Sequence, residues 1–587
     1  MGADNVHAIK GERMYDTGST TFMLICTMLV FLMTPGLAFF YGGLSRRKNV
    51  INTMLMCFSA IGLVGVLWIV AGWSLAYGGD GSSPFIGGLD QLLCLPVLNQ
   101  VLQAAEGNAT DGAVYPQIIN IAFQMAFAMI TAAIVTGSLA GRVKFGAMTA
   151  FLGIWLLVVY APLAHMVWGG EGSFIGDIIG ALDFAGGDVV HISSGLTGLI
   201  LCLMLGRRRG FGMVSYRPHN VPFVALGAGL LWFGWFGFNG GSTVCATGDD
   251  VLTSMGRIFV TTNMAAASAA TATMFLTWLR YGKPDVSMTL NGALAGLVAI
   301  TAGCDAVSVP GAFVIGIIAG LVIVFAVEFF DQIARIDDPV GAISVHGVCG
   351  ALGTLLVGVF AVDGGLLYGG GSELLIIQAT GVAAVAAYIG IVMTLIFQIL
   401  DKTIGLRVST REEIAGLDME EHGLASSYAD FMPAAEDFHG AVTAQEAAEA
   451  GAAVTHVTAA LPSAGRPKMT KIVIITSQLR FEILKEALDK LGITGMTVTK
   501  VLGYGLQKGN TEYYRGAEVS VHLLPKVKVE LVVSAIPVAA VVAAAKKVLY
   551  TGKYGDGKIF IYDVENVVKI RTGEEGYEAL QDEPIEA

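Results

Sequence analysis

The stretch Leu182-Asp183-Phe184-Ala185-Gly186-Gly187-Asp188-Val189-Val190-His191 places an imidazole at the start of a long apolar segment, which continues over residues 192–205. A second stretch, Asp338-Pro339-Val340-Gly341-Ala342-Ile343-Ser344-Val345-His346, opens another apolar segment in the same way. In both, an aspartate precedes the histidine by eight residues, and glycines follow the histidine by four and by seven residues. The shared spacing predicts that the two stretches belong to an internal repeat.

The geometry of a helix sharpens this prediction. A helix rises about 1.5 Å per residue and half of a hydrocarbon core is about 15 Å deep. A histidine eight residues beyond an aspartate at the membrane surface therefore lies near the midplane. If the two helices enter from opposite faces, His191 and His346 meet there, as in an inverted-topology transporter repeat. The alternative is that each imidazole is a core group bonded to a neighbouring hydroxyl or carbonyl. Ionisable groups inside bilayers, however, usually line pathways.

The composition is that of a polytopic membrane protein. Of the 587 residues, 54% are hydrophobic and only 14% are charged, which is too apolar for an ordinary soluble protein. The net charge of -12 gives no indication of nucleic-acid binding, because the acidic residues cluster outside the apolar runs. Eleven runs have the length of a membrane span: residues 20–42, 50–76, 116–140, 146–168, 188–205, 222–240, 251–279, 288–303, 310–330, 342–361 and 373–400.

Charged residues assign the sides of the membrane. Lys and Arg occur in alternate loops between the runs, and the other loops carry acidic residues without Lys or Arg. By the positive-inside rule the N-terminus is outside and the C-terminus is in the cytoplasm. The fifth run, with His191, then enters from outside and the tenth, with His346, enters from inside. This is the opposed entry that the repeat requires.

The cysteines give no sign of a metal site. The seven cysteines show no CxxC or Cys/His spacing, and most of them lie inside apolar runs, where free thiols pack as small hydrophobic groups. Cys94, Cys245 and Cys304 fall near expected outer loops, which leaves a disulfide open without favouring one.

The character of the chain changes after residue 400. Residues 401–431 are mixed and charged and indicate an ordered tail, whereas residues 433–468 have few large apolar side chains and indicate a linker. From Met469 onward, strand-like and helical patterns follow in the order βαββαβ, which predicts a ferredoxin-like α+β unit. We therefore expect a membrane domain over residues 1–410, a tail and linker over 411–468 and an α+β regulatory domain over 469–587.

Motifs in both parts carry resemblances to known families. Residues 15 to about 410 resemble the ammonium transporter (Amt/Mep/Rh) family. The resemblance lies in Ala164-His165-Met166-Val167-Trp168-Gly169-Gly170, Asp183 to His191, Pro218-His219-Asn220, Trp235-Phe236-Gly237-Phe238-Asn239 and His346-Gly347-Val348-Cys349-Gly350. Residues 469–577 resemble the PII (GlnK-like) signal-transduction proteins in Thr494-Gly495-Met496-Thr497-Val498, Gln507-Lys508-Gly509, Tyr514-Arg515-Gly516-Ala517-Glu518, Leu524-Pro525-Lys526-Val527-Lys528 and Gly555-Asp556-Gly557-Lys558-Ile559.

The first resemblance implies a homotrimer in membrane lipid with one narrow pore for ammonium or ammonia in each subunit. It assigns Trp168, Phe127 and Ser242 to an ammonium recruitment site, where aromatic faces hold a cation. It assigns Phe127 and Phe238 to a stacked gate below that site. Asp183 lies behind the recruitment site, and its alternative role as a helix N-terminal cap is compatible with this position.

Beyond the gate, the resemblance assigns His191 and His346 to the lining of the pore. In a dry channel ammonium can donate hydrogen bonds to neutral imidazoles and potassium cannot, so selectivity follows from donors rather than from size. We expect deprotonation at the gate, passage of ammonia and movement of the proton along the histidines. His165, His219 and Trp235 also stand in matching motifs, and we expect them to be structural because no partner at a useful spacing is evident.

In the α+β domain, glycines and lysines over residues 551–558 make an anion cradle by their own chemistry. The PII resemblance implies regulatory ATP or ADP here, and 2-oxoglutarate at Gln507, Lys508 and Lys526, with Mg held together with ATP through Gln507 and no metal held by the protein alone. The nucleotide-binding residues that it implies are Thr497, Gly503, Gly555, Asp556, Gly557, Lys558, Lys569 and Arg571.

Several positions depart from the two families. Leu506 and Lys569 stand where an arginine is usual, and because lysine cannot replace the bidentate fork of arginine we expect altered nucleotide affinity. Val519 occupies the place of a tyrosine that some relatives modify, which excludes uridylylation there. Gly341 stands where many relatives of the membrane part carry an acid.

The fusion itself suggests regulation within one chain. Free PII proteins of this type block ammonium transporters by inserting a loop into the cytoplasmic pore mouth, and Arg515 matches the loop tip. A flexible linker of about 36 residues spans on the order of 30 to 35 Å and gives a millimolar effective concentration. We expect the PII part to dock on its own transporter in a bacterial cytoplasmic (inner) membrane and to gate it. The alternatives are an ammonium sensor with little flux and an enzyme, for which no motif-supported base or nucleophile is present.

Overall fold

A computed structural model describes residues 15–79, 81–97, 114–212, 216–424, 468–477, 480–493, 495–503, 511–514, 517–520, 524–552 and 555–580. The chain divides into two compact units, one formed by the chain up to Ala429 and one formed mainly by the chain from Asp430 onward. Each unit has a hydrophobic core of its own.

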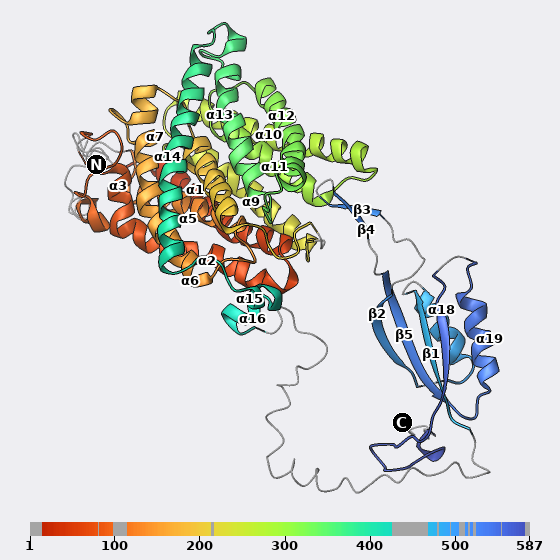
Figure 1. The fold of residues 1–587 in the computed structure, drawn as a ribbon. Helices are drawn as coiled ribbons and strands as arrows, with labels where there is room; N and C mark the ends of the chain where they lie inside the picture. The colour runs from red at the N-terminus through yellow and green to blue at the C-terminus, as the bar shows by residue number, and fades with distance from the viewer. Residues whose placement is uncertain are drawn as a thin grey trace, which may run out of the picture. The chain divides into compact units, whose positions relative to one another are not determined.

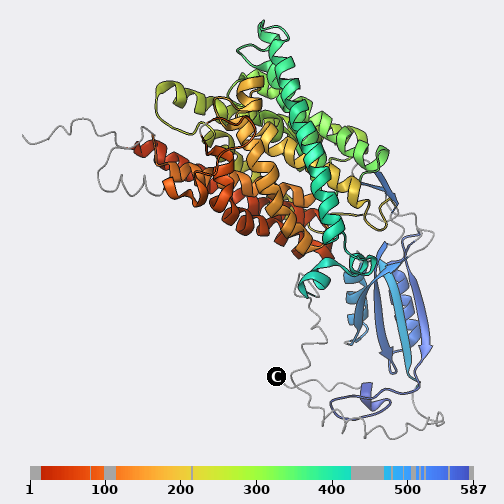
Figure 2. The ribbon, with the colours of Figure 1, turned by 60° about the vertical axis from the view of Figure 1, so that its left-hand side comes forward.

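The first unit is a bundle of apolar helices, and the long helix α14 crosses the near side of this bundle in both ribbon views (Figure 1, Figure 2). Ten helical segments of the described chain are long and apolar enough to cross a membrane, and an eleventh, α11 (Val286–Thr301), is apolar but shorter. The prediction of a polytopic helical protein with eleven apolar helices is confirmed. The ten are α1 (Thr17–Leu44); η1 (Arg47–Asn49), α2 (Val50–Leu67), η2 (Trp68–Gly72) and α3 (Trp73–Tyr77); α5 (Gln117–Gly137); α6 (Phe145–Trp155), η4 (Leu156–Tyr160) and α7 (Ala161–Trp168); η6 (Gly187–Ile192) and α8 (Ser193–Leu205); α9 (Val221–Gly241); α10 (Asp249–Tyr281); α12 (Val309–Glu328) and η7 (Phe329–Ile333); η8 (Ile343–Val348) and α13 (Cys349–Phe360); and α14 (Glu373–Thr403).

Glycines allow α10, α11 and α12 to pack closely. A Cβ on Gly296 of α11 or on Gly316 of α12 would lie 2.3 Å from the carbonyl oxygen of Ala265 in α10. The Ser268 hydroxyl of α10 donates to the carbonyl of Phe313 in α12 at 3.1 Å. Small side chains and hydroxyls that bond across helices are characteristic of membrane bundles. All seven cysteines are free, so the structure contains none of the disulfides that the sequence left open.

The described part of the tail packs on the membrane unit through two short helices, α15 (Thr410–Ala415) and α16 (Leu417–His422). The Asp418 carboxylate accepts a hydrogen bond from the backbone N–H of Asn52 at 2.8 Å. The N–H of Leu417 donates to the side chain of Asn49 at 2.9 Å. The tail is thereby held against the N-terminus of α2.

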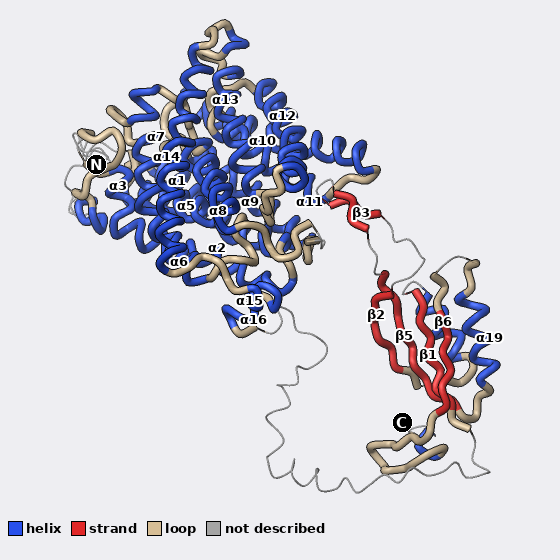
Figure 3. The backbone as a smooth tube through the Cα atoms, viewed as in Figure 1, coloured by secondary structure: helices blue, strands red, loops and turns tan. Residues whose placement is uncertain are grey.

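The second unit is a four-stranded antiparallel sheet in the order β2-β5-β1-β6, with both helices packed on one face (Figure 3). The strands are β1 (Thr470–Ser477), β2 (Thr497–Gly503), β5 (Leu524–Val533) and β6 (Lys558–Asp563), and the helices are α18 (Phe481–Asp489) and α19 (Val538–Leu549). The predicted βαββαβ order is confirmed. The structure adds a two-stranded hairpin, β3 (Thr511–Tyr514) and β4 (Ala517–Ser520), between β2 and β5.

Candidate functional site

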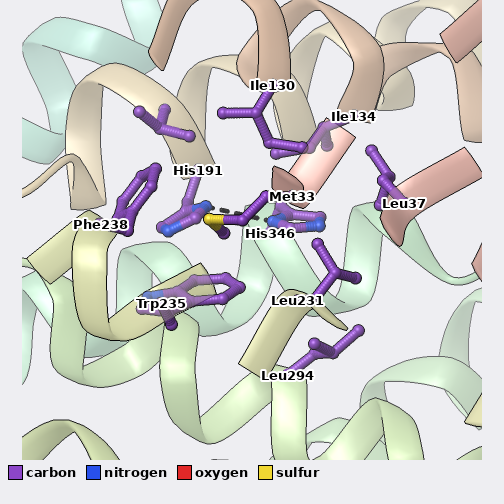
Figure 4. A pocket seen from close by; sticks show the side chains of 11 residues that line it. Met33, Leu37, Ile130, Ile134, His191, Leu231, Trp235, Phe238, Leu294 and His346 are labelled. Atoms are coloured by element: carbon purple, nitrogen blue, oxygen red, sulfur yellow. Dashed lines mark hydrogen bonds between the residues drawn. The ribbon is translucent and has the colours of Figure 1, made fainter. Parts of the chain in front are cut away.

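The two histidines of the repeated stretches lie side by side. His191 and His346 are 1% and 5% exposed, their Nδ1 atoms are 3.1 Å apart, and their rings are 5.2 Å apart with an interplanar angle of 28° (Figure 4). Each lies in a π-helical turn, His191 in η6 and His346 in η8. Such wide turns are rare and occur frequently at functional sites. One Nδ1 must donate and the other accept, which requires at least one neutral imidazole.

Glycines explain how the two helices come so close. A Cβ on Gly195, four residues after His191, would lie 2.1 Å from the backbone nitrogen of Gly347. A Cβ on Gly350, four residues after His346, would lie 3.0 Å from the Cβ of His191. The glycine that follows each histidine is therefore the surface against which the other histidine segment packs. This is the physical reason for the repeated spacing.

Asp183 caps the helix that carries His191. Its two carboxylate oxygens accept hydrogen bonds from the backbone N–H groups of residues 186–189 at distances from 2.6 to 3.2 Å. Four N–H donors around two oxygens are the arrangement that an ionised carboxylate satisfies. The backbone carbonyl of Asp183 also accepts from the indole N–H of Trp168 at 2.8 Å. The geometry thus provides the cap expected as an alternative, and the same residue orients the Trp168 ring.

Aromatic rings lie on one side of the paired histidines. Phe127 stacks on Phe238 with ring centroids 4.0 Å apart and an interplanar angle of 16°, and the edge-to-face contact of Phe127 with Trp168 is 6.2 Å. The Ser242 hydroxyl donates to the carbonyl of Phe238 at 2.9 Å, which leaves its oxygen lone pairs as acceptors. Phe127 and Phe238 are buried. The stacked pair therefore lies between Trp168 and His191.

A small apolar cavity encloses the two imidazoles. Figure 4 shows His191 between Phe238 and His346, and the ring centroids of His191 and Phe238 are 6.0 Å apart. The cavity volume is ≈ 10 Å³, which is about the space that one water-sized molecule requires. The Nε2 of His191 has no hydrogen-bond partner among the described residues. The other lining residues are Met33, Leu37, Ile130, Ile134, Val190, Leu231, Trp235 and Leu294.

Three further motif residues differ in their surroundings. Trp235, which we expected to be structural, lies in the cavity wall with its ring 5.5 Å from His191, while its N–H donates to Thr301 at 3.0 Å. Both ring nitrogens of His165 contact backbone carbonyl oxygens, at 2.9 and 2.8 Å. A ring nitrogen of His219 contacts the carbonyl oxygen of Ser45 at 3.0 Å. These two imidazoles have structural partners, whereas Trp235 belongs to the site.

In the second unit, one end of the sheet gathers a lysine and the glycine-rich loop. Lys526 donates to the carbonyl of Gly555 at 2.9 Å, and a Cβ on Gly503 would lie 2.9 Å from the Lys526 side chain. Gly557 has a φ of +118° and its Cβ would lie 2.0 Å from the carbonyl oxygen of Ile475, so only glycine fits there. A cavity of ≈ 700 Å³ next to this loop is lined by Lys546, Lys547 and Lys558, among others. Cations beside a glycine-rich loop fit a phosphate-bearing ligand.

The other expected nucleotide residues lie toward the opposite end of the sheet. Thr497 pairs with Glu530 at the end of the sheet where Thr470 pairs with Val533 and with Asp563. Lys569 and Arg571 follow β6, which ends there. Gly503 follows Thr497 by six positions along β2, so the two residues are about 20 Å apart along the strand. Within one chain the expected nucleotide-binding residues therefore form two groups. Gln507, Lys508 and Arg515 lie outside the described residues.

Comparisons with known proteins agree with this architecture. Residues 21–427 match the Ammonium Transporter Family and residues 469–574 match the Nitrogen regulatory protein P-II family. An ammonium transporter of Mycobacterium bovis is 41% identical over 71% of this chain and 91% of its own length, and one of Aquifex aeolicus is 44% identical over 71% and 95%. A solved structure named "Sensor Amt Protein" is 31% identical, covers 69% of this chain and 98% of its own, and has a TM-score of 0.62.

Fold and site together define a polytopic membrane protein of the transporter class, with a ferredoxin-like domain at its C-terminus. The chain belongs to the Ammonium Transporter Family and carries a C-terminal PII domain. Both resemblances found in the sequence are confirmed.

Proposed function

We propose that the membrane unit carries ammonium across the bacterial cytoplasmic membrane through a pore lined by His191 and His346. The observation that supports this most strongly is the pair of imidazoles with Nδ1 atoms 3.1 Å apart in an apolar cavity, directly behind a stacked phenylalanine pair. The relatives reported above are ammonium transporters. A row of aromatic rings followed by neutral nitrogen acceptors suits a small cation that can lose a proton.

The residues act in sequence along this row. Ammonium rests against Trp168 and Phe127 and donates to the free lone pairs of Ser242. At the Phe127–Phe238 pair the ion gives up one proton, and ammonia enters the cavity, where it donates to or accepts from the imidazoles. The proton passes between His191 and His346 through the short Nδ1–Nδ1 contact. Potassium has no proton to donate or to lose, so it is excluded.

Ammonium-evoked current in proteoliposomes tests this proposal. Wild-type protein is expected to give a current with ammonium and none with potassium, and His346→Leu is expected to lose the ammonium current because it removes one of the two nitrogen groups. His219→Ala is the matched control, since its imidazole bonds to the Ser45 carbonyl away from the cavity. An ammonium current that survives in His346→Leu would contradict the proposal.

We further propose that the PII domain regulates the pore in a homotrimer. The glycine-rich loop and its lysines support binding of ATP or ADP, with 2-oxoglutarate at Lys526 and Gln507. The side-chain amino group of Lys526 donates to the carbonyl of Gly555 in this structure, so a carboxylate ligand would have to replace that hydrogen bond. Deletion of residues 433–587 is expected to make the ammonium current independent of nucleotide and 2-oxoglutarate. An unchanged ligand response after deletion would exclude regulation by this domain.

A second candidate function is an ammonium sensor. The specific observation in its favour is the similarity to the structure named "Sensor Amt Protein", which this chain matches over 98% of that chain. A sensor would bind ammonium at the aromatic site with little flux and pass the occupancy to the PII domain. Ammonium that alters nucleotide binding without evoking a current would favour the sensor over the transporter.

A further inference from the structure

The membrane unit contains a second buried aspartate beside Asp183. Asp188 lies in η6 and is 0% exposed. Its backbone N–H donates to the Asp183 carboxylate at 2.8 Å, but neither oxygen of its own carboxyl group has a hydrogen-bond partner among the described residues. A buried carboxylate without a partner is one of the most costly groups in a protein, and more so inside a membrane.

The side chain of Asp188 faces α14 rather than a basic group. Its Oδ2 lies 3.9 Å from the position of a Cβ on Gly381 of α14. Gln378, one turn earlier on the same helix, already uses its amide group on the backbone of Leu182 and on the carbonyl of Thr354. The hydroxyl of Thr354 also has no partner within the described chain. Among the residues that the structure describes, none donates a hydrogen bond to the Asp188 carboxyl group, so a negative charge there is uncompensated.

No buried lysine or arginine lies on the described elements that pack against η6. The elements packed against η6 include α5, α7, α8, α11, α13, α14 and η8. The buried titratable side chains on its own stretch and on these neighbours are Asp183, His165, His191, Cys202, His346 and Cys349, and buried Cys304 follows the end of α11. Because Asp183 already holds a negative charge by accepting four N–H bonds, a second anion five residues later is disfavoured.

We propose that Asp188 is a proton-binding carboxyl group whose protonation is coupled to occupancy of the cation site at Trp168. With the site empty, Asp188 holds a proton as an O–H bond. A cation near Asp183 offsets the local negative charge, so the O–H bond of Asp188 breaks and its proton forms an N–H bond on the histidine pair, through which it moves on as proposed above. When the bound ammonium loses its own proton, an O–H bond re-forms on Asp188 and ammonia moves on. Each cycle returns Asp188 to its protonated form. This role of Asp188 rests on the transport function proposed above.

A proton fits this site better than a metal ion. Among the described residues no group of three or more His, Cys, Asp or Glu side chains could hold a metal. A bound sodium or calcium ion would require several oxygen ligands at about 2.3–2.6 Å. A Cβ on Gly381 of α14 would lie 2.7 Å from the Cβ of Ala181 and 3.9 Å from Oδ2, so the space beside Oδ2 is closed to a set of ligands, whereas a proton needs no additional space.

Infrared difference spectroscopy on the full-length protein tests the proton directly. In the wild type without ammonium, we expect the C=O stretching band of a protonated carboxylic acid. This band should shift in D₂O and should disappear when ammonium is added. Asp188→Asn is expected to lack this signal, whereas Asp363→Asn, an exposed loop variant, should retain it. A wild type without the signal, or an Asp188→Asn variant that keeps it, would overturn the proposal.

Ammonium currents across pH provide the second measurement. Asp188→Asn preserves shape but cannot titrate, so its current is expected to fall about tenfold or more and to lose the pH dependence of the wild type. An identical pH profile in Asp188→Asn would overturn the proton role. The infrared signal of the wild type does not depend on flux. If the protein shows that ammonium-sensitive signal but carries no current, transport fails while the proton-binding site stands.

Discussion

At the scale of single residues, the contact between the imidazoles depends on Gly195, which has only a hydrogen atom where other residues have a side chain. The Cβ introduced by Gly195→Ala would lie 2.1 Å from the backbone nitrogen of Gly347, which cannot rotate away. We expect a loss of about 1–3 kcal/mol in stability and a loss of ammonium current, because the two histidine segments must separate. Thermal unfolding of the purified protein and proteoliposome currents measure the two effects.

The matched control for this substitution is Gly229→Ala in α9, where no atom lies within 4 Å of the added Cβ. Alanine in a helix interior is favoured over glycine by about 0.5–1 kcal/mol, so this variant should be equally or more stable. Equal unfolding temperatures and equal currents for Gly195→Ala and Gly229→Ala would contradict the packing argument.

A buried aspartate outside the spans makes a prediction about pH. Asp337 lies between the guanidinium groups of Arg208 and Arg142, at 2.6 and 2.8 Å. Burial raises the pKa of the Asp337 carboxyl, but the two guanidinium groups outweigh burial and hold that pKa well below its usual value. The stabilisation is therefore present above the unfolded pKa of about 3.9 and is lost only as the pH falls through the lower folded pKa.

Asp337→Asn is accordingly expected to destabilise the protein by about 3–5 kcal/mol at neutral pH, because it removes the carboxylate that pairs with two buried arginines. The difference from wild type should stay constant down to about pH 5 and shrink in stronger acid. Unfolding temperatures over a pH series measure it, with the exposed Asp363→Asn as control. A stability difference between wild type and Asp337→Asn that is largest in acid would contradict this prediction.

The sequence predicted some of these residues and not others, for physical reasons. His191, His346 and Asp183 were predictable because polar groups in apolar runs are conspicuous. Trp235 was expected to be structural, and the position of its ring in the cavity wall was not predictable, because the direction of an indole ring depends on which helix lies opposite. The unpaired state of Asp188 was not predictable at all, since the lack of a partner is a property of the packed neighbours.

At the scale of elements, the apolar runs and the βαββαβ order were predictable because hydropathy and alternation are local properties. The π-helical form of η6 and η8 was not, because hydropathy does not distinguish a π-helical turn from an α-helical one. The β3–β4 hairpin was also missed, because the sequence there reads as a glycine-rich loop.

The tail helix α15 is held by a buried acid, which gives a prediction at this scale. The Glu413 carboxylate accepts from the guanidinium of Arg407 at 2.8 Å and from the N–H of Arg209 at 2.6 Å. Glu413→Gln is expected to weaken tail docking by about 1–3 kcal/mol and to make the tail more sensitive to trypsin. The exposed Glu420→Gln is the control, and equal cleavage rates of the two variants would show that Glu413 does not anchor the tail.

At the scale of the whole molecule, the two groups of expected nucleotide residues can serve one ligand only if more than one chain contributes. Lys558 pairs with Ile475 at one end of the sheet, whereas Arg571 follows β6 beyond the other end. A phosphate ligand cannot bridge the roughly 16 Å that five strand residues of β6 span. If both residues serve one nucleotide, they come from neighbouring copies, as a closed ring of subunits with heterologous interfaces allows. The exposed apolar side chains Phe560, Ile561 and Tyr562 of β6 suit such a contact.

Mixed oligomers test this arrangement. Lys558→Ala and Arg571→Ala, each expressed alone in the full-length chain, are expected to weaken ATP binding about tenfold or more, because each removes a charge-assisted bond from every site. When the two variants are co-expressed and mix at random, about one quarter of the interfaces combine an intact Lys558 with an intact Arg571. Isothermal titration should then show tight binding with about a quarter of the wild-type stoichiometry. A site contained in one chain would give no recovery, since each polypeptide would still lack one of the two cations.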